Sequence, residues 1–158
     1  MRIEVRGIPG PQGSKKFVGF SGKGKALLVE SSSKVKPWRY VVTMCAIEAR
    51  GAEQISFAGP VNVEMHFTMP KPKSCPKSRK WPDRKPDLSK LVRSTEDALT
   101  ESGIWEDDAR VVRVTATKLW PNEGEHALSS PGVVILIEPM LYKLCTTPNP
   151  IVFSGTAG

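Results

Sequence analysis

The segment from residue 85 to residue 103 constrains the fold most, because a proline, a helical pattern and a glycine follow one another there. Pro86 pushes Lys85 toward extended backbone, so a helix can begin only beyond it. Asp87 then stands at the N-cap position, where its carboxylate can accept from the first-turn amides. Ser102-Gly103 ends the segment. We predict one helix with a buried face, because residues recur at helical spacing at Leu88, Leu91, Val92, Thr95 and Leu99.

Carboxylates stand at both ends of this predicted helix. Asp87 precedes it, and Asp107-Asp108 follow it, just before the alternating segment 111–119. A hard cation such as Mg²⁺ prefers oxygen ligands, usually one or two carboxylates, with water and substrate phosphate completing the shell. We therefore predict an acidic metal centre of Asp87, Asp107 and Asp108. Asp108 is the stronger of the adjacent pair, because successive strand residues point to opposite faces.

Several short motifs follow one another in order through this region: Lys85-Pro86-Asp87, Asp97-Ala98-Leu99, Gly103, Asp107-Asp108 and a valine at 111 or 112. The series resembles the signature of the RusA-like Holliday junction resolvases, small endonucleases of phages and prophages. The resemblance covers about residues 3–138. It implies a RusA-like fold and a Mg²⁺-dependent endodeoxyribonuclease, with Mn²⁺ as a possible substitute. It also implies a homodimer that cuts opposed strands of a four-way DNA junction in recombination, repair or phage DNA processing.

Three positions depart from that signature. Ser89 stands where the family has a second aspartate, Lys90 where it has asparagine, and Arg93 where it has lysine. The family uses the aspartate as a metal ligand, so Ser89 leaves the site one negative charge short. On a regular helix Ser89, Arg93 and Glu96 share a face. Glu96 is therefore a candidate to supply a carboxylate, directly or through water, and Ser89 and Lys90 are further accessory candidates.

Arg93 is the cationic catalytic candidate, because it matches the family lysine. An arginine cannot donate a proton at ordinary pH, so it would act as fixed positive charge against the phosphate. An intrahelical ion pair with Glu96 or Asp97 is the alternative interpretation, and the sequence leaves both open.

The segment 69–85 combines prolines with many cations and cannot form a regular element. A basic loop leading into an acidic site suits contact with a DNA backbone. Lys15 and Lys16 end a second loop rich in proline and glycine and are also candidates. The alternative is that both segments are simply solvated. The DNA-binding candidates are Lys15, Lys16, Lys71, Lys73, Lys77, Arg79, Lys80, Arg84 and Lys85.

The composition favours a polyanionic partner. The net charge is +7 over 158 residues, with 39% hydrophobic and 25% charged residues, as in a globular domain that binds nucleic acid. Three widely spaced cysteines without a CxxC pair argue against a disulfide framework or a zinc site. No apolar run reaches membrane-spanning length and no signal peptide is evident, so we expect a cytoplasmic protein without membrane contact.

The order of patterns predicts an α+β fold in one domain, with a mixed β-sheet packed against two main helices. Strands are expected over 2–8, 17–20, 25–30, 61–67, 110–120 and 132–138, and a first helix over 36–50. The strands 110–120 and 132–138 are expected to pair as a hairpin. We assign residues 1–138 to the nuclease domain and 139–158 to a poorly ordered tail.

The sequence also predicts the environment of several individual side chains. Trp38, Phe17 and Phe20 are predicted to be core residues. Glu64 and His66 share the polar face of the strand 61–67, where a solvated surface is favoured over an acid–base pair.

The predicted function is a metal-dependent, structure-specific endodeoxyribonuclease that resolves four-way junctions. The alternative is a junction-binding or branched-DNA-binding protein with weak or no cleavage, because Ser89 replaces a metal-site aspartate. Both interpretations predict DNA binding that weakens steeply with salt. Only the first predicts cleavage that depends on the acidic residues.

Overall fold

The computed structural model describes all residues except 14, 23, 25, 31–32 and 141–158; for 15–18 and 26–30 it describes the backbone alone. Along these described residues it has two helices, six strands and one short 3₁₀ turn, η1. Their bounds are β1 Arg2–Arg6, β2 Lys15–Phe20, β3 Ala26–Glu30, α1 Val35–Arg50, β4 Val61–Thr68, α2 Leu88–Glu101, η1 Asp108–Arg110, β5 Val111–Leu119 and β6 Gly132–Pro139. The predicted α+β class with a mixed sheet and two helices is confirmed.

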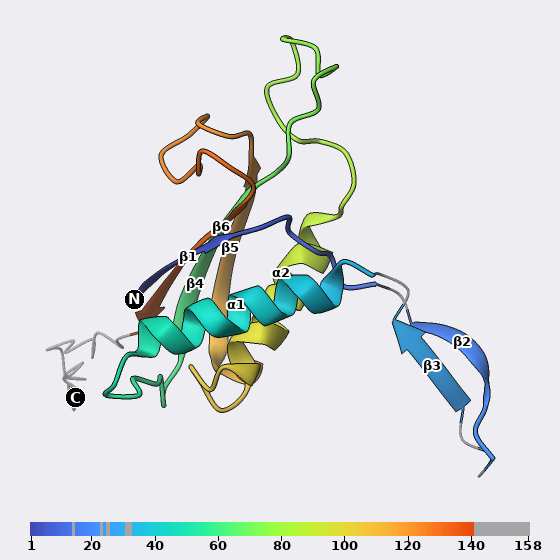
Figure 1. The fold of residues 1–158 in the computed structure, drawn as a ribbon. Helices are drawn as coiled ribbons and strands as arrows, with labels where there is room; N and C mark the ends of the chain where they lie inside the picture. Colours follow the sequence, from blue (N-terminus) through green and yellow to red (C-terminus); the bar gives the residue numbers. More distant parts are fainter. Residues whose placement is uncertain (14, 23, 25, 31–32, 141–158) are drawn as a thin grey trace, which may run out of the picture.

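Four strands form one sheet in the order β1-β6-β4-β5. β4 pairs with β6 antiparallel and with β5 parallel. The predicted hairpin between 110–120 and 132–138 is therefore wrong, because β4 lies between the two strands. β4 can take that central place because it buries every second side chain, from Val61 to Phe67, toward the helices. β2 and β3 form a separate two-stranded sheet that extends away from the four-stranded one (Figure 1).

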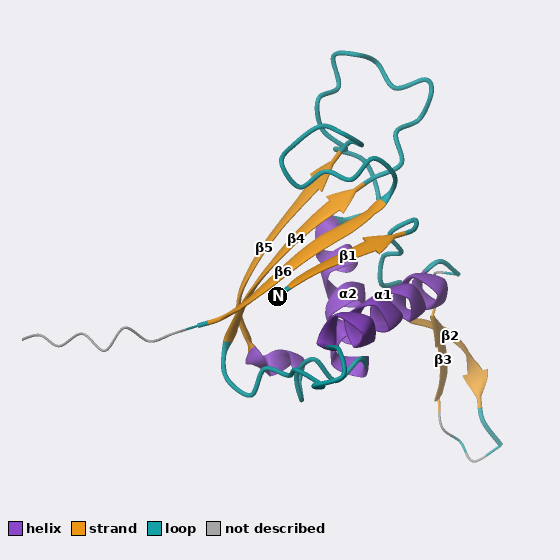
Figure 2. Ribbon diagram, turned by 60° about the vertical axis from the view of Figure 1, so that its left-hand side comes forward, coloured by secondary structure: helices purple, strands orange, loops and turns teal. Residues whose placement is uncertain are grey.

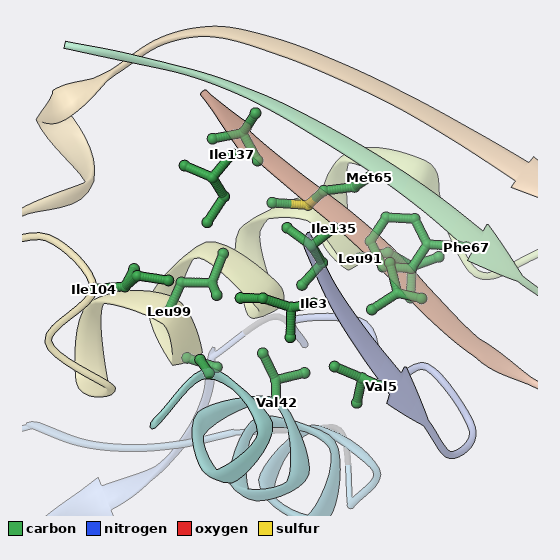
Figure 3. Packing of buried hydrophobic residues seen from close by; sticks show 14 of the residues in the cluster. Ile3, Val5, Val42, Met65, Phe67, Leu91, Leu99, Ile104, Ile135 and Ile137 are labelled. Carbon is green, nitrogen blue, oxygen red and sulfur yellow. The ribbon is translucent and has the colours of Figure 1, made fainter. Parts of the chain in front are cut away.

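Both helices pack on the same face of the four-stranded sheet, as Figure 2 shows. The alternating strands turn Ile3, Val5, Met65, Phe67, Ile135 and Ile137 toward helix residues Val42, Leu91 and Leu99 (Figure 3). Burying a side chain of this size stabilises the fold by about 1.5–3 kcal/mol. This packing fixes α2 against the sheet, and α2 carries the candidate site.

Trp38 confirms its predicted core position, since it is buried and its indole Nε1 donates to Thr95 Oγ1 at 3.1 Å. The bond links α1 to α2. Phe20 was predicted to be core, but it is 70% exposed. It lies in the two-stranded sheet, which is too small to have an interior. The side chain of Phe17 lies outside the described residues.

The face of the sheet away from the helices is partly covered. Val134 of β6 is fully buried and Leu136 is half-buried, in keeping with the continuous apolar run of this strand. His66 of β4 is also mostly buried: its Nδ1 lies 2.8 Å from Thr117 Oγ1 and its ring lies against His126. The solvated surface expected around Glu64 and His66 is therefore wrong for His66, because the segment that carries His126 packs over it.

Candidate active site

The N-terminus of α2 begins where the sequence predicts, but its cap differs. Asp87 occupies the N-cap position with extended backbone, yet its side chain makes no capping hydrogen bond. Its Oδ2 instead lies 3.3 Å from Lys90 Nζ. The carboxylate is about half exposed. Asp87 is therefore available to a ligand at the start of the helix.

The two aspartates after α2 have different roles. Asp107 is the N-cap of η1, and its Oδ1 accepts from the amide of Ala109 at 2.8 Å. Asp108 is the first residue of η1, not a strand residue, and its carboxylate has no hydrogen bond or ion pair in the described part of the chain. The prediction that Asp108 is the stronger candidate of the pair rested on strand geometry, whereas Asp108 lies in η1. In the structure the two aspartates differ because Asp107 caps η1 with its side chain, whereas Asp108 does not.

Tertiary packing brings η1 back against α2. Trp105 is buried and its Nε1 donates to Thr100 Oγ1 at 2.8 Å, which ties the turn after α2 to the end of the helix. Asp108 consequently lies within electrostatic range of Glu96, two turns from the start of α2. A helix end and the start of a strand are rigid supports for a pair of ligands.

Glu96 is half-buried, and several influences act on its pKa. Burial raises the pKa most, and the charges of Asp108 and Asp97 raise it further, while Arg93 opposes them. Asp97 has its own partner, because its Oδ2 lies 3.1 Å from Arg39 Nη1. Asp108 and Glu96 therefore form a carboxylate pair in which neither group has a cation within ion-pair distance among the described residues.

Arg93 is exposed on the same helix face. Within the described chain it makes no ion pair, so the alternative of a tight pair with Glu96 or Asp97 is not realised. Its charge still acts on Glu96 at longer range. The guanidinium is therefore free to receive a phosphate beside the Asp108–Glu96 pair. Ser89, one helical turn before Arg93, is exposed as well.

The described residues contain no group of three or more His, Cys, Asp or Glu side chains positioned to hold one metal ion. The structure thus does not gather Asp87, Asp107 and Asp108 into a single cluster. A pair of carboxylates nevertheless fits Mg²⁺, which keeps several waters and takes one or two protein carboxylates. The Asp108–Glu96 pair has that composition.

A cavity of about 620 Å³ opens beside the N-terminus of α2, between the loop 8–13 and the loop 69–87. Asp87 and Lys90 line it, whereas Asp107 and Asp108 do not. Five cations and two carboxylates contribute to its lining: Lys34, Arg79, Arg84, Lys85 and Lys90 against Asp83 and Asp87. The lining is therefore net positive, next to the carboxylate that precedes α2.

The predicted basic loop divides into two groups. Lys71 pairs with Glu123 and lies over Trp120, and Arg79 pairs with Asp83 at 3.4 Å. The others have no ion pair within the described residues and are exposed: Lys73, Lys77, Lys80, Arg84 and Lys85. These five are the better candidates for phosphate contact. The side chains of Lys15 and Lys16 lie outside the described residues, so their predicted role stays a prediction.

Sequence reasoning missed two residues of the cavity, Gln12 and Lys34. Gln12 Oε1 is buried without a hydrogen-bond partner in the described structure. Neither residue belongs to a motif or a periodic pattern. Gln12 reaches the cavity because the loop 8–13 folds against α2, where the backbone N–H of Gln12 donates to Lys90 O at 2.8 Å. Lys34 reaches it from the N-cap position of α1.

Comparison with known proteins gives the family. The family model of endodeoxyribonuclease RusA matches residues 7–137, most of the chain. The chain belongs to the RusA endodeoxyribonuclease family. The match begins just after β1 and extends into β6, and it includes the loop 69–87, α2 and η1. The resemblance seen in the sequence motifs is thereby confirmed, and membership implies endodeoxyribonuclease activity on Holliday junctions.

A curated relative is also similar to this RusA-family chain. It is the uncharacterized protein YqaN of Bacillus subtilis strain 168, which is 28% identical over 133 residues. The alignment covers 78% of this chain and 89% of YqaN. In the part of the chain that the structure describes, neither helix is long and apolar enough to cross a membrane.

Proposed function

We propose that this RusA-family protein is a Mg²⁺-dependent resolvase of four-way DNA junctions whose centre is the Asp108–Glu96 pair beside Arg93. The observation that carries the proposal is that η1 packs against α2 and brings Asp108 within electrostatic range of Glu96, while Arg93 of that helix has no ion pair within the described residues. A bound cation would relieve the repulsion between the two carboxylates, and the family membership supplies the reaction class.

Each residue has a defined task in this proposal. Asp108 and Glu96 would hold the ion, and Asp87 would approach it from the start of α2 once substrate is bound. A bound Mg²⁺ would orient a water for in-line attack and neutralise charge on the phosphate oxygens. Arg93 stabilises the phosphate as fixed charge and does not donate a proton. Mn²⁺ is expected to substitute, because it accepts the same oxygen ligands.

In this proposal Glu96 is a main metal ligand, whereas the sequence alone indicated only an accessory ligand. The family places its second carboxylate where this chain has Ser89, and Ser89 cannot supply a charge. Glu96 lies two helical turns further along the same face, close enough to Asp108 for their charges to interact. We infer that the missing carboxylate has been replaced from this position.

The basic loop would hold the DNA backbone. Lys73, Lys77, Lys80, Arg84 and Lys85 have no competing ion pair in the described structure. Phosphate contacts of this kind supply affinity without sequence information.

A homodimer with two centres would cut opposed strands of the near-symmetric junction. Cytoplasmic location is expected for an enzyme with this substrate.

One observation favours a second candidate function, junction binding with weak or no cleavage. No three metal-ligating side chains converge within the described residues. A protein with this donor set could bind junctions and cleave them weakly or not at all. It would then act as a junction-binding module of the same family.

One assay separates the two functions. A labelled four-way junction is incubated with the protein, with and without Mg²⁺, and the strands are resolved under denaturing conditions. Paired symmetric nicks that need Mg²⁺ and are lost in Asp108→Asn support the resolvase. Tight binding without nicks at any Mg²⁺ or Mn²⁺ concentration rejects it in favour of the binding module. Glu106→Gln is the matched control, because Glu106 is a neighbouring exposed carboxylate that only pairs with Arg110.

A further inference from the structure

The cavity beside α2 has the dimensions of a small-molecule site. Its volume of about 620 Å³ lies within the ~300–1,000 Å³ usual for ligand pockets. A DNA duplex is too wide to enter it, but a single nucleotide is not. The cavity also adjoins Asp87 and the basic loop that would follow the DNA backbone.

Beside its charged residues, the cavity has a stiff apolar wall. Six of the 18 lining residues are prolines: Pro9, Pro11, Pro70, Pro72, Pro82 and Pro86. Pyrrolidine rings have a fixed backbone angle φ and little side-chain freedom, so a flat ligand can pack on them at low entropic cost. Trp120 also lines the cavity, but its Nε1 donates to Arg79 O and its ring faces Lys71, so the stacking surface is mainly proline.

The loop that forms one wall is held in place before any ligand arrives. Ser94 Oγ donates to Gly10 O at 2.6 Å, and the backbone N–H of Gln12 donates to Lys90 O. At Gly10 a Cβ atom would lie 2.3 Å from Lys34 O, so only glycine allows this approach to the start of α1. The shape of the cavity is therefore a built feature of the fold.

Gln12 lines the cavity, and one polar atom of its side chain has no partner in the described structure. Gln12 Oε1 is buried and accepts no hydrogen bond in the described structure. Leaving such an acceptor unpaired costs about 1–3 kcal/mol, so a ligand that donates to it is favoured. Every DNA base except thymine carries an exocyclic amine on its hydrogen-bonding edge, and thymine carries a ring N–H there, so each base offers a donor. The cations Lys34, Arg84 and Lys85 line the same cavity without ion pairs in the described chain, and suit the attached phosphate.

We propose that this cavity receives one unstacked nucleotide of the bound junction, with its base between the proline walls and its edge donating to Gln12 Oε1. This subsite rests on the proposed function, since the nucleotide comes from the junction. Bases at a branch point are the cheapest to extrude, because extrusion costs least where stacking and pairing are already weak. The subsite would recognise branched DNA over duplex and set the position of the nick relative to the branch.

The first test needs no cleavage. Junctions carrying 2-aminopurine at single positions around the branch are mixed with the protein in EDTA. We expect a several-fold fluorescence change, relative to free junction, at one position per strand pair. A profile that is flat across all positions, with the junction bound, overturns the subsite. Because binding and nicking are measured separately, that outcome leaves the resolvase proposal standing, whereas a junction that is not bound rejects both.

The second test assigns the hydrogen bond to Gln12. An abasic nucleotide at the responsive position should weaken junction binding in the wild type. In Gln12→Met that penalty should shrink by about threefold to tenfold, the range of one net hydrogen bond. Asn62→Leu is the matched control, because Asn62 Oδ1 is also buried without a partner in the described structure but belongs to β4 outside the cavity. Equal abasic penalties in wild type and Gln12→Met overturn the assignment. If Gln12→Met fails to fold, the 2-aminopurine profile of the wild type decides alone.

Discussion

The two ends of α2 present opposite electrostatic problems. At its start, Asp87 is neutralised by Lys90 and lies in a cavity with a net positive lining. Along its far half, Glu96 faces Asp108 with no cation in ion-pair distance among the described residues. The first end is ready for an anion and the second for a cation. In the proposed function, a phosphodiester and a metal ion bound between them would meet both needs.

The largest expected effect comes from breaking the cation-binding end. Asp108→Asn should lower the rate of junction cleavage by about 10²-fold or more, because a ligand and its charge are removed while the fold is kept. Junction binding in EDTA should persist, since a negative charge near the DNA has been removed. A gel-shift and a nicking assay on the same sample measure both. Cleavage at the wild-type rate would show that the centre lies elsewhere.

Glu96→Gln should lower cleavage by about 10–100-fold and should also weaken the stabilisation by Mg²⁺. Burial and the neighbouring carboxylates raise the pKa of Glu96 in the folded protein. The stability that protonated Glu96 contributes is therefore fully present below the unfolded pKa and is lost as pH rises through the folded pKa. At neutral pH without metal, the variant should therefore melt at a higher temperature than the wild type. Thermal melts with and without Mg²⁺ measure both effects.

Asp97→Asn serves as the control for Glu96→Gln. It removes an adjacent carboxylate whose partner is Arg39, so it should lose stability and keep the Mg²⁺ response. If both variants respond alike to Mg²⁺, Glu96 is not a ligand.

The basic loop that leads to the start of α2 can be tested through salt dependence. Replacing Lys73, Lys77 and Lys80 together by alanine should reduce the slope of log K against log salt by about 0.9 for each phosphate that the variant no longer neutralises. Lys71→Ala is the comparison, because Lys71 is already paired with Glu123 and should leave the slope unchanged. An unchanged slope in the triple variant would mean that the loop is only solvated.

The smallest effect is expected far from both ends. Burial and His126 lower the pKa of His66, so the neutral form is favoured in the folded protein. Its contribution to stability is present above the unfolded pKa, near 6.5, and is lost as pH falls through the folded pKa. His66→Asn should flatten the melting temperature between about pH 5 and 7 without changing junction binding. A change in junction binding would link the face of the sheet away from the helices to DNA.

Most of the elements followed from local patterns. The helix α2 was predictable because Pro86 excludes an earlier start and the apolar spacing fixes one buried face. The basic loop was evident from its prolines and cations. The absence of a capping hydrogen bond from the Asp87 side chain was not predictable, since the choice between the helix amides and Lys90 depends on geometry that neighbouring residues set.

The sequence by itself determined both helices, the main strands and the charges that each segment carries, because these depend on residues close together in the chain. It did not give η1, and it placed Lys15 and Lys16 in a loop although they begin β2. Tertiary structure alone decided that β4 separates β5 from β6, that Asp108 meets Glu96, and that the loop 8–13 closes a cavity over α2. The physical reason is that these arrangements depend on contacts between distant segments. Their free energy comes from packing the whole core, which no local pattern records.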